Sequence, residues 1–358
     1  MRRRDHPRRQ LDNAAAGASP LDPLTHALSG AALARALPHR PLNRGPFILL
    51  VLLTMAPDAD FLLKFISDTT YLEHHRGLTH SLLMLPLWSW LAWAGLRRWQ
   101  GEQTLSPLLI GAALLMHIML DLITSFGTMI LAPLSDWRAA LDLVYIVDPL
   151  FSACLLLPLL IGLFWKRRRR ALAVSALVLM CAYLIMATLA HRQALAITRS
   201  AWPEADSVAA LPMPFSPFHW QLIASYPGHY QRCSLNLWPH FSGTSRLFPI
   251  AFVQRYNANI HSAEHLQWQD LPAMSSLKIQ RELPGMAFYR WFARFPVILE
   301  QDDSHIECGD LRFGAGVAGQ KSAFRLRIDL GSKPKAWLIW RGESKSELTQ
   351  RTAPFQWL

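Results

Sequence analysis

The chain has 358 residues, 51% of them hydrophobic, and a mean hydropathy of +0.15, which excludes an ordinary soluble protein of this length. Its formal net charge of +11 would suit nucleic-acid binding, but the basic residues concentrate in short tracts beside apolar runs. The main tracts are 2–9, 97–98 and 166–170. Such tracts are typical of the cytoplasmic flanks of membrane segments, so we expect no direct nucleic-acid partner.

Residues 1–20 form a basic N-terminal extension without the apolar core of a signal peptide. A short helix is predicted over 24–37, with Asp22 as its N-cap and Pro23 at its first position. The basic extension conflicts with the orientation of the later segments. Either this short helix is re-entrant, or residues 1–20 are not native and the chain starts functionally at Leu21.

Five apolar runs follow, at 46–66, 81–96, 105–123, 143–165 and 171–190. About 20 apolar residues cross a bilayer, and fewer suffice where the bilayer thins. The sequence therefore predicts an α-helical multi-pass membrane domain over residues 21–195, in a bacterial inner membrane. If the basic loops are cytoplasmic, the loops at 67–80 and 125–142 face the periplasm.

Beyond about residue 195 the sequence becomes mixed polar and aromatic, with strand-like runs at 323–329 and 336–340. We expect a smaller β-rich extramembrane domain over residues 196–358, in the periplasm by the same charge rule. Cys233 and Cys308 lie in this part. They either pair, since that compartment permits disulfides, or remain two buried thiols.

Histidines and aspartates inside or beside the apolar runs predict a metal site, because lipid rejects such groups unless they face one another or water. His117 and Asp121 are four residues apart and share one face of a helix. His26 follows Asp22 at the same spacing, and Asp58 and Asp60 come directly after a helix-breaking proline. Taken singly, each group also fits a buried hydrogen bond or a solvated helix end.

The densest cluster holds His75, Arg76 and His80 directly before an apolar run. An arginine beside metal-binding histidines suits an anionic substrate such as a phosphoester. In the expected orientation, one set of histidines and aspartates lies at or near the periplasmic ends of their segments, which favours one shared site. The set is Asp58, Asp60, His75, His80, His117, Asp121 and Asp148. The H-x-x-E-H pattern at 261–265 lies in a polar stretch without helical periodicity, so we leave it outside the site.

Five motifs resemble, in the same order, those of the YdjM-type family of inner-membrane proteins, which are described as metal-dependent hydrolases. They are residues 22–30, 57–60, 75–81, 117–121 and 121–128. The resemblance covers about residues 21–165 and implies a hydrolase, with phospholipase-like activity among the options. By resemblance alone it also implies a LexA-type repressor as a partner. The family begins with Met where Leu21 stands here.

Carried over by position, the resemblance implies six metal ligands and two catalytic residues. The ligands are His26, Asp58, His75, His80, His117 and Asp121, and the catalytic residues are Asp60 and Arg76. One or two divalent ions, zinc first and manganese second, would activate a water that attacks a phosphoester or other lipid ester of the membrane. Thr25, Thr79 and Ser81 are expected to donate hydrogen bonds to ligands. The alternative is a non-enzymatic membrane protein that binds or transports a metal.

Overall fold

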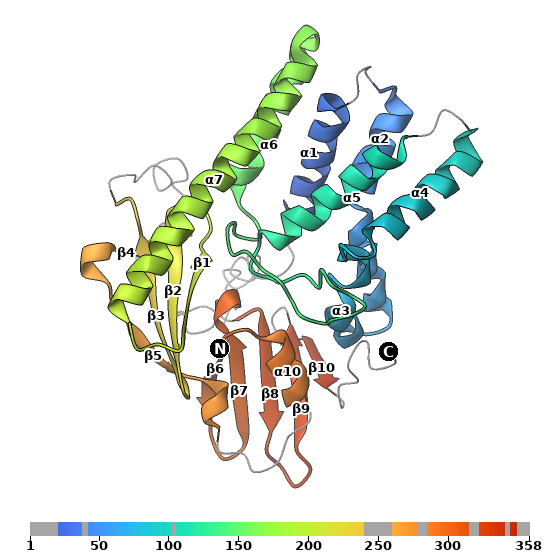
Figure 1. Cartoon of the computed structure of the whole chain (residues 1–358). Coiled ribbons are helices and arrows are strands. Elements are labelled where there is room, and N and C mark those ends of the chain that lie inside the picture. Colours follow the sequence, from blue (N-terminus) through green and yellow to red (C-terminus); the bar gives the residue numbers. More distant parts are fainter. Residues whose placement is uncertain are drawn as a thin grey trace, which may run out of the picture.

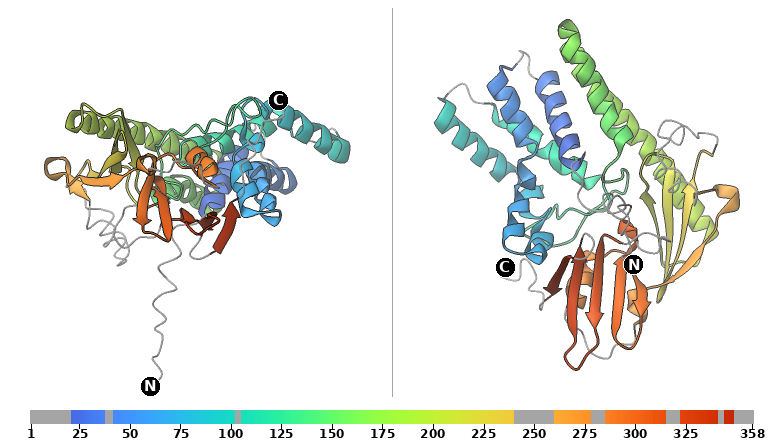
Figure 2. Two further views of the ribbon diagram at one scale, coloured as in Figure 1. Left: turned by 90° about the horizontal axis from the view of Figure 1, so that it is seen from below. Right: turned by 180° about the vertical axis from the view of Figure 1, so that it is seen from behind.

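The computed structural model describes residues 21–37, 42–101, 105–239, 260–277, 285–314, 322–340 and 344–348. Helices make up its first part and two β-sheets its second part (Figure 1). Residues 1–20, and with them the predicted extension, lie outside the described residues. Figure 2 shows from behind that the sheet β6 to β10 lies beside both the helical part and the first sheet.

The helical part begins with α1, and α7 is its longest helix. In order the elements are α1 (Leu21–Ala36), α2 (Arg44–Leu53), η2 (Ala56–Phe65), α3 (Asp68–His74), η3 (Leu78–His80), α4 (Leu85–Gln100), α5 (Pro107–Leu122), α6 (Pro149–Phe164), η5 (Lys166–Arg168) and α7 (Arg169–Ala201). Side-chain caps fix three of the starts: Ser67 accepts the amide of Thr70, Ser106 accepts that of Leu109, and Asp148 accepts those of Leu150 and Phe151. A cap of this kind contributes about 1 kcal/mol.

The predicted multi-pass helical domain is wrong. Among the described residues, one helix, Lys166–Ala201, is long and apolar enough to cross a membrane, and α2 with η2 qualifies only as a pair bent by 57°. Helices α4, α5 and α6 have 16 residues each, or about 24 Å, against a hydrocarbon core of about 30 Å. The helices are shorter than the apolar runs for two reasons. Pro57 breaks the first run, and α5 and α6 begin only at Pro107 and Pro149, after their runs have started.

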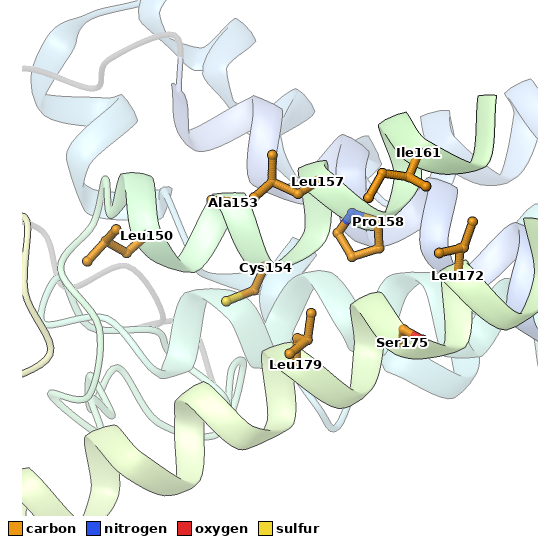
Figure 3. Close-up of a pocket in the computed structure, with 9 residues that line it drawn as sticks. All are labelled: Leu150, Ala153, Cys154, Leu157, Pro158, Ile161, Leu172, Ser175 and Leu179. Atoms are coloured by element: carbon orange, nitrogen blue, oxygen red, sulfur yellow. The ribbon is translucent and has the colours of Figure 1, made fainter. Parts of the chain in front are cut away.

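An apolar groove of about 360 Å³ separates parts of α6 and α7 (Figure 3). Leu157 and Pro158 of α6 line it together with Leu172 and Leu179 of α7. Ser175 carries the only hydroxyl group among the nine lining residues. This face of the α6–α7 hairpin therefore suits apolar surroundings better than water.

The first sheet has the order β1-β2-β3-β4, and β5 also pairs with β3. Its strands are β1 (Ser207–Pro212), β2 (His219–Tyr226), β3 (His229–Asn236), β4 (His261–Ser262) and β5 (Gln269–Pro272). The last turns of α7 pack on this sheet, because Ala190 and Ala194 share a buried cluster with Trp220. The H-x-x-E-H pattern lies in β4 and η6 (Ala263–His265), not on an α-helix.

The second sheet is an antiparallel meander in the order β10-β9-β8-β7-β6. Its strands are β6 (Pro296–Gln301), β7 (His305–Asp310), β8 (Phe324–Asp329), β9 (Lys335–Trp340) and β10 (Ser344–Leu348), and the short helices η7 (Met274–Ser276), α10 (Met286–Phe292) and η8 (Leu311–Phe313) accompany it. The predicted β-rich region is thus present, and β8 and β9 confirm the two predicted strands. Cys233 and Cys308 are buried in different sheets and free, so the disulfide alternative is wrong.

The second sheet and the helical part share one hydrophobic core. Tyr71, Leu72 and Phe126 from the helical part belong to the same buried cluster as Phe288 and Phe292 of α10. The segments that carry the predicted metal residues therefore pack directly against the C-terminal part of the chain.

Candidate metal centre

Four predicted ligands meet inside the helical part: Asp58 of η2, His80 of η3, and His117 and Asp121 of α5. Their candidate ligand atoms all lie within 4.8 Å of one another. His117 and Asp121 reach the site together because they are four residues apart on one helix. Pro57 prevents α2 from continuing as an α-helix, and the η2 turn that contains it directs Asp58 toward α5.

The spacing of these atoms fits a tetrahedral ion. The Nε2 atoms of His80 and His117 are 2.9 Å apart, and Oδ2 of Asp121 lies 3.0 Å from the first and 3.5 Å from the second. Oδ1 of Asp58 is 3.5 Å from both nitrogens. A tetrahedron with metal–ligand bonds of about 2.0–2.1 Å has edges of about 3.3–3.4 Å, so the four atoms outline a site of zinc size.

Hydrogen bonds to the other ring nitrogens fix the tautomers of both histidines. Nδ1 of His117 must donate to the carbonyl of Thr54 at 2.7 Å, because a carbonyl only accepts. The Thr79 hydroxyl donates to Asp60 at 3.2 Å and so accepts from Nδ1 of His80 at 2.9 Å. In the neutral rings both Nε2 atoms are therefore unprotonated and face each other, an arrangement that a cation between them stabilises. In the metal-free protein burial lowers the pKa of His117, but the carboxylates of Asp121 and Asp58 outweigh this effect and raise it to about 10, so a proton can take the place of the cation.

The carboxylate of Asp121 also fits a metal. Its Oδ2 atom is buried and has no hydrogen-bond partner among the described residues. A buried carboxylate oxygen is costly unless it is paired or binds a metal. The donor set of two imidazole nitrogens and two carboxylate oxygens is one that zinc and manganese both accept.

Asp60, predicted to be catalytic, is the centre of a hydrogen-bond network beside the four ligands. It accepts from Nδ1 of His75 at 2.9 Å, from the amide of Arg76 at 3.1 Å and from Thr79. Burial lowers the pKa of His75 and outweighs the opposite effect of Asp60, so this ring is neutral near pH 7. Asp58, Asp60 and His75 form a second group within 4.8 Å, which offers a position for a second ion that shares Asp58.

Arg76, the other predicted catalytic residue, faces a ligand. Its guanidinium group contacts Oδ1 of Asp121 at 2.9 Å and donates to the hydroxyl of Thr124 at 2.9 Å. The side chain is 3% exposed, and its backbone φ of 60° lies in the left-handed region that non-glycine residues rarely adopt. Sequence reasoning did not single out Thr124, although it lies one helical turn after Asp121.

His26 lies beside the four-residue group. Its Nε2 is 3.4 Å from Oδ1 of Asp121, and its ring stacks on His117 with 3.9 Å between centroids. Thr79 makes the contact expected of a supporting donor, but two other predicted donors do not reach the site. Thr25 contacts Ser152, and Ser81 donates to backbone carbonyls of residues 130 and 132. Asp148 caps α6 and accepts from Tyr183.

Of the four ligands, Asp58 is the one whose side chain is exposed to solvent. The Asp58 side chain is 32% exposed, whereas those of His80, His117 and Asp121 are 0–1% exposed. The η2 residues after Asp58 include Phe61 and Leu62, whose apolar side chains are exposed. Any molecule that reaches the four ligands thus approaches next to an apolar surface.

A family model described as YdjM inner membrane protein matches residues 21–194. Over this segment, just under half of the chain, the sequence is similar to the YdjM family. The match covers all six predicted ligands and both predicted catalytic residues, while both β-sheets lie outside it. The family is named for the inner membrane, and Lys166–Ala201 is the one unbroken candidate span among the described residues.

The chain is also similar to a protein described as "Uncharacterized protein YfhP" from Bacillus subtilis (strain 168). The two chains are 31% identical over 98 residues, which is 27% of this chain and 30% of the relative. The similarity thus spans less than a third of that relative's length. No solved structure matches the chain at a significant level.

Proposed function

We propose that this chain is a membrane-bound hydrolase that uses one divalent metal ion held by Asp58, His80, His117 and Asp121. The observation that carries the proposal is the pair of Nε2 atoms that face each other at 2.9 Å between two carboxylates. Similarity to a family named for the inner membrane supports the membrane part of the proposal. Zinc fits the spacing best, and manganese is the second choice.

When bound, such an ion would lower the pKa of a coordinated water to about 7 and so supply hydroxide for hydrolysis. The residues of the chain prepare the site for it. Asp60 orients His75 directly and His80 through Thr79, which directs Nε2 of His80 toward the other ligand atoms. Arg76 offsets the charge of Asp121 and fixes the carboxylate in place.

The surroundings of the opening favour a lipid ester, with a phosphoester first, as the substrate. Asp58 is the exposed ligand, and the neighbouring η2 side chains Phe61, Leu62 and Phe65 are exposed and apolar. A substrate held in a membrane would approach along such a surface without leaving lipid. Membrane lipids are therefore the partners we propose, whereas a LexA-type partner has only the family resemblance behind it.

The competing function is metal binding or transport without catalysis. Transport through the chain itself would need a polar path across several spans, and the described residues contain one unbroken candidate span. A site whose exposed ligand lies beside an apolar surface favours hydrolysis over transport of the metal ion.

The test is metal analysis of the full chain purified in detergent, followed by a screen of phospholipids, phosphodiesters and carboxylic esters. His117→Ala should remove bound zinc or manganese, because it deletes one of four ligands. His74→Ala is the matched control: His74 adjoins the cluster but bonds to the Thr70 carbonyl and belongs to no ligand group. Unchanged metal content in His117→Ala would refute the site. Metal binding without cleavage of any ester would favour the competing function.

A further inference from the structure

The loop 123–148 follows the ligand Asp121 and joins α5 to α6. It is held by residues outside the segment 21–194 that the family model matches. Trp291 donates its indole N–H to the carbonyl of Asp136 at 3.1 Å, and Arg294 pairs with Asp142 at 2.6 Å. Both donors lie near α10 and β6, more than ninety residues beyond the end of the family match. The C-terminal part of the chain therefore fixes the distal portion of the loop.

The contact nearest to the metal centre comes from Arg312 in η8. Its Nη1 donates to the carbonyls of Phe126 at 2.8 Å and Ser125 at 3.3 Å. Asp310 accepts from Nε of the same guanidinium at 2.8 Å, and the two side chains are 3% and 0% exposed. A buried arginine with a paired carboxylate and a fixed fork of donors holds its acceptors in one geometry.

Phe126 lies between Arg312 and the residues of the metal centre. Its ring lies 4.9 Å from the guanidinium carbon of Arg76 and meets the His75 ring edge-on at 5.5 Å. Arg76 in turn binds Oδ1 of Asp121, whose other oxygen belongs to the four-ligand group. An unbroken series of contacts thus joins Arg312 to a metal ligand.

We propose that Arg312 is a positioning residue for the metal centre and that residues 21–194 alone do not complete that centre. The inference rests on the metal binding of the proposed function. Without Arg312, two buried carbonyls lose their donor and the 125–126 backbone gains freedom. The ring of Phe126 then no longer covers Arg76, and water reaches the pair that orients Asp121.

The experiment measures Co²⁺ binding by the full chain in detergent, through the visible absorption of the bound ion and competition with a chelator. Arg312→Met should weaken Co²⁺ binding about 10-fold or more and change the absorption spectrum, as loss of a supporting partner does at metal sites. Arg325→Met is the matched control, because Arg325 pairs with Glu307 in the same sheet and its side chain is 13% exposed. This control should keep wild-type affinity and spectrum.

Hydrogen exchange of the peptide 121–130 in metal-free protein gives a second readout. Exchange should rise in Arg312→Met and stay at the wild-type level in Arg325→Met. If Arg312→Met does not fold, Phe126→Leu replaces it, since leucine keeps an apolar side chain in the core but removes the ring over Arg76. Phe126→Leu should show the same loss of Co²⁺ affinity, and wild-type affinity would exclude the route through the ring.

Two results would overturn the positioning role: wild-type affinity, spectrum and exchange in Arg312→Met, or an equal loss in Arg325→Met. Failure of the proposed function is a separate outcome. A wild-type chain that binds no Co²⁺ would refute the metal centre, while the exchange of peptide 121–130 would still show whether Arg312 holds the loop.

Discussion

The helical part and the β-sheet part distribute their polar and apolar side chains in opposite ways. In the helical part the buried interior holds His80, His117, Asp121 and Arg76, while large apolar side chains such as Phe164 are exposed. In the sheet part Trp220 and its neighbours are buried. Among the described residues after 201, only Trp238 and Leu299 are large, apolar and exposed.

We infer from this contrast that the helical part suits lipid and that the sheet part suits water. An apolar exterior is stable in lipid, and a buried charged cluster is retained only where the charges pair or serve a function. The sheet part follows the pattern of a water-soluble domain, with its apolar residues inside. Helix α7 belongs to both, since it lies within the candidate span Lys166–Ala201 and its last turns pack on Trp220.

The largest expected effect concerns the side of the membrane on which the sheets lie. The five basic residues Lys166–Arg170 should hold the start of α7 in the cytoplasm, so a single crossing by α7 puts the sheets in the periplasm. A reporter that is active only in the periplasm, fused after Leu358, should be fully active. If that fusion is silent while a cytoplasmic fluorescent fusion is bright, both the side of the sheets and the side of the metal site are wrong.

The buried charges of the helical part give the next largest effect. Asp121→Asn should lower the free energy of unfolding of the metal-free protein by about 3–5 kcal/mol, because it leaves Arg76 buried without its ion-pair partner. Asp142→Asn is the control: its partner Arg294 is 40% exposed and hydrates when released, so the cost should be about 1 kcal/mol or less. Denaturant unfolding in detergent measures both, and equal costs would contradict the contrast in burial.

A pair of aromatic truncations sharpens the comparison between the two parts. Trp220→Ala should cost about 3–5 kcal/mol in the sheet part, since Trp220 is 0% exposed. Phe164→Ala in the helical part should stay within about 0.5 kcal/mol, since Phe164 is 88% exposed. Thermal unfolding of both variants in the same detergent is the measurement. A large loss from Phe164→Ala would show that another part of the protein covers this residue.

Local patterns predicted part of the fold and of the site. The alternation of residues 323–329 indicated a strand, and β8 is buried on alternate residues. The spacing of His117 and Asp121 placed both on one helical face, where the structure has them. These features succeed because they depend on residues within one or two turns of each other.

Other features depend on contacts between distant segments, which no local pattern reveals. Nothing near Arg76 in the sequence indicates that it binds Asp121, and nothing near Arg312 indicates that it reaches Phe126. Asp148, which was expected at the same membrane level as the site residues, caps α6 and is not one of the four clustered ligands. Hydropathy alone also overestimated the spans, since it ignores where prolines start or break helices.

The bend between α2 and η2 affects the metal centre as well as the membrane span. In an uninterrupted α-helix the carbonyl of Thr54 would accept the amide of Asp58, four residues later. Here that carbonyl accepts the ring N–H of His117, and Asp58 turns its carboxylate toward the same histidine. A helix that continued through Pro57 would occupy the acceptor and leave the His117 ring free to rotate. The bend that interrupts the α2–η2 segment therefore also fixes the orientation of the His117 ring.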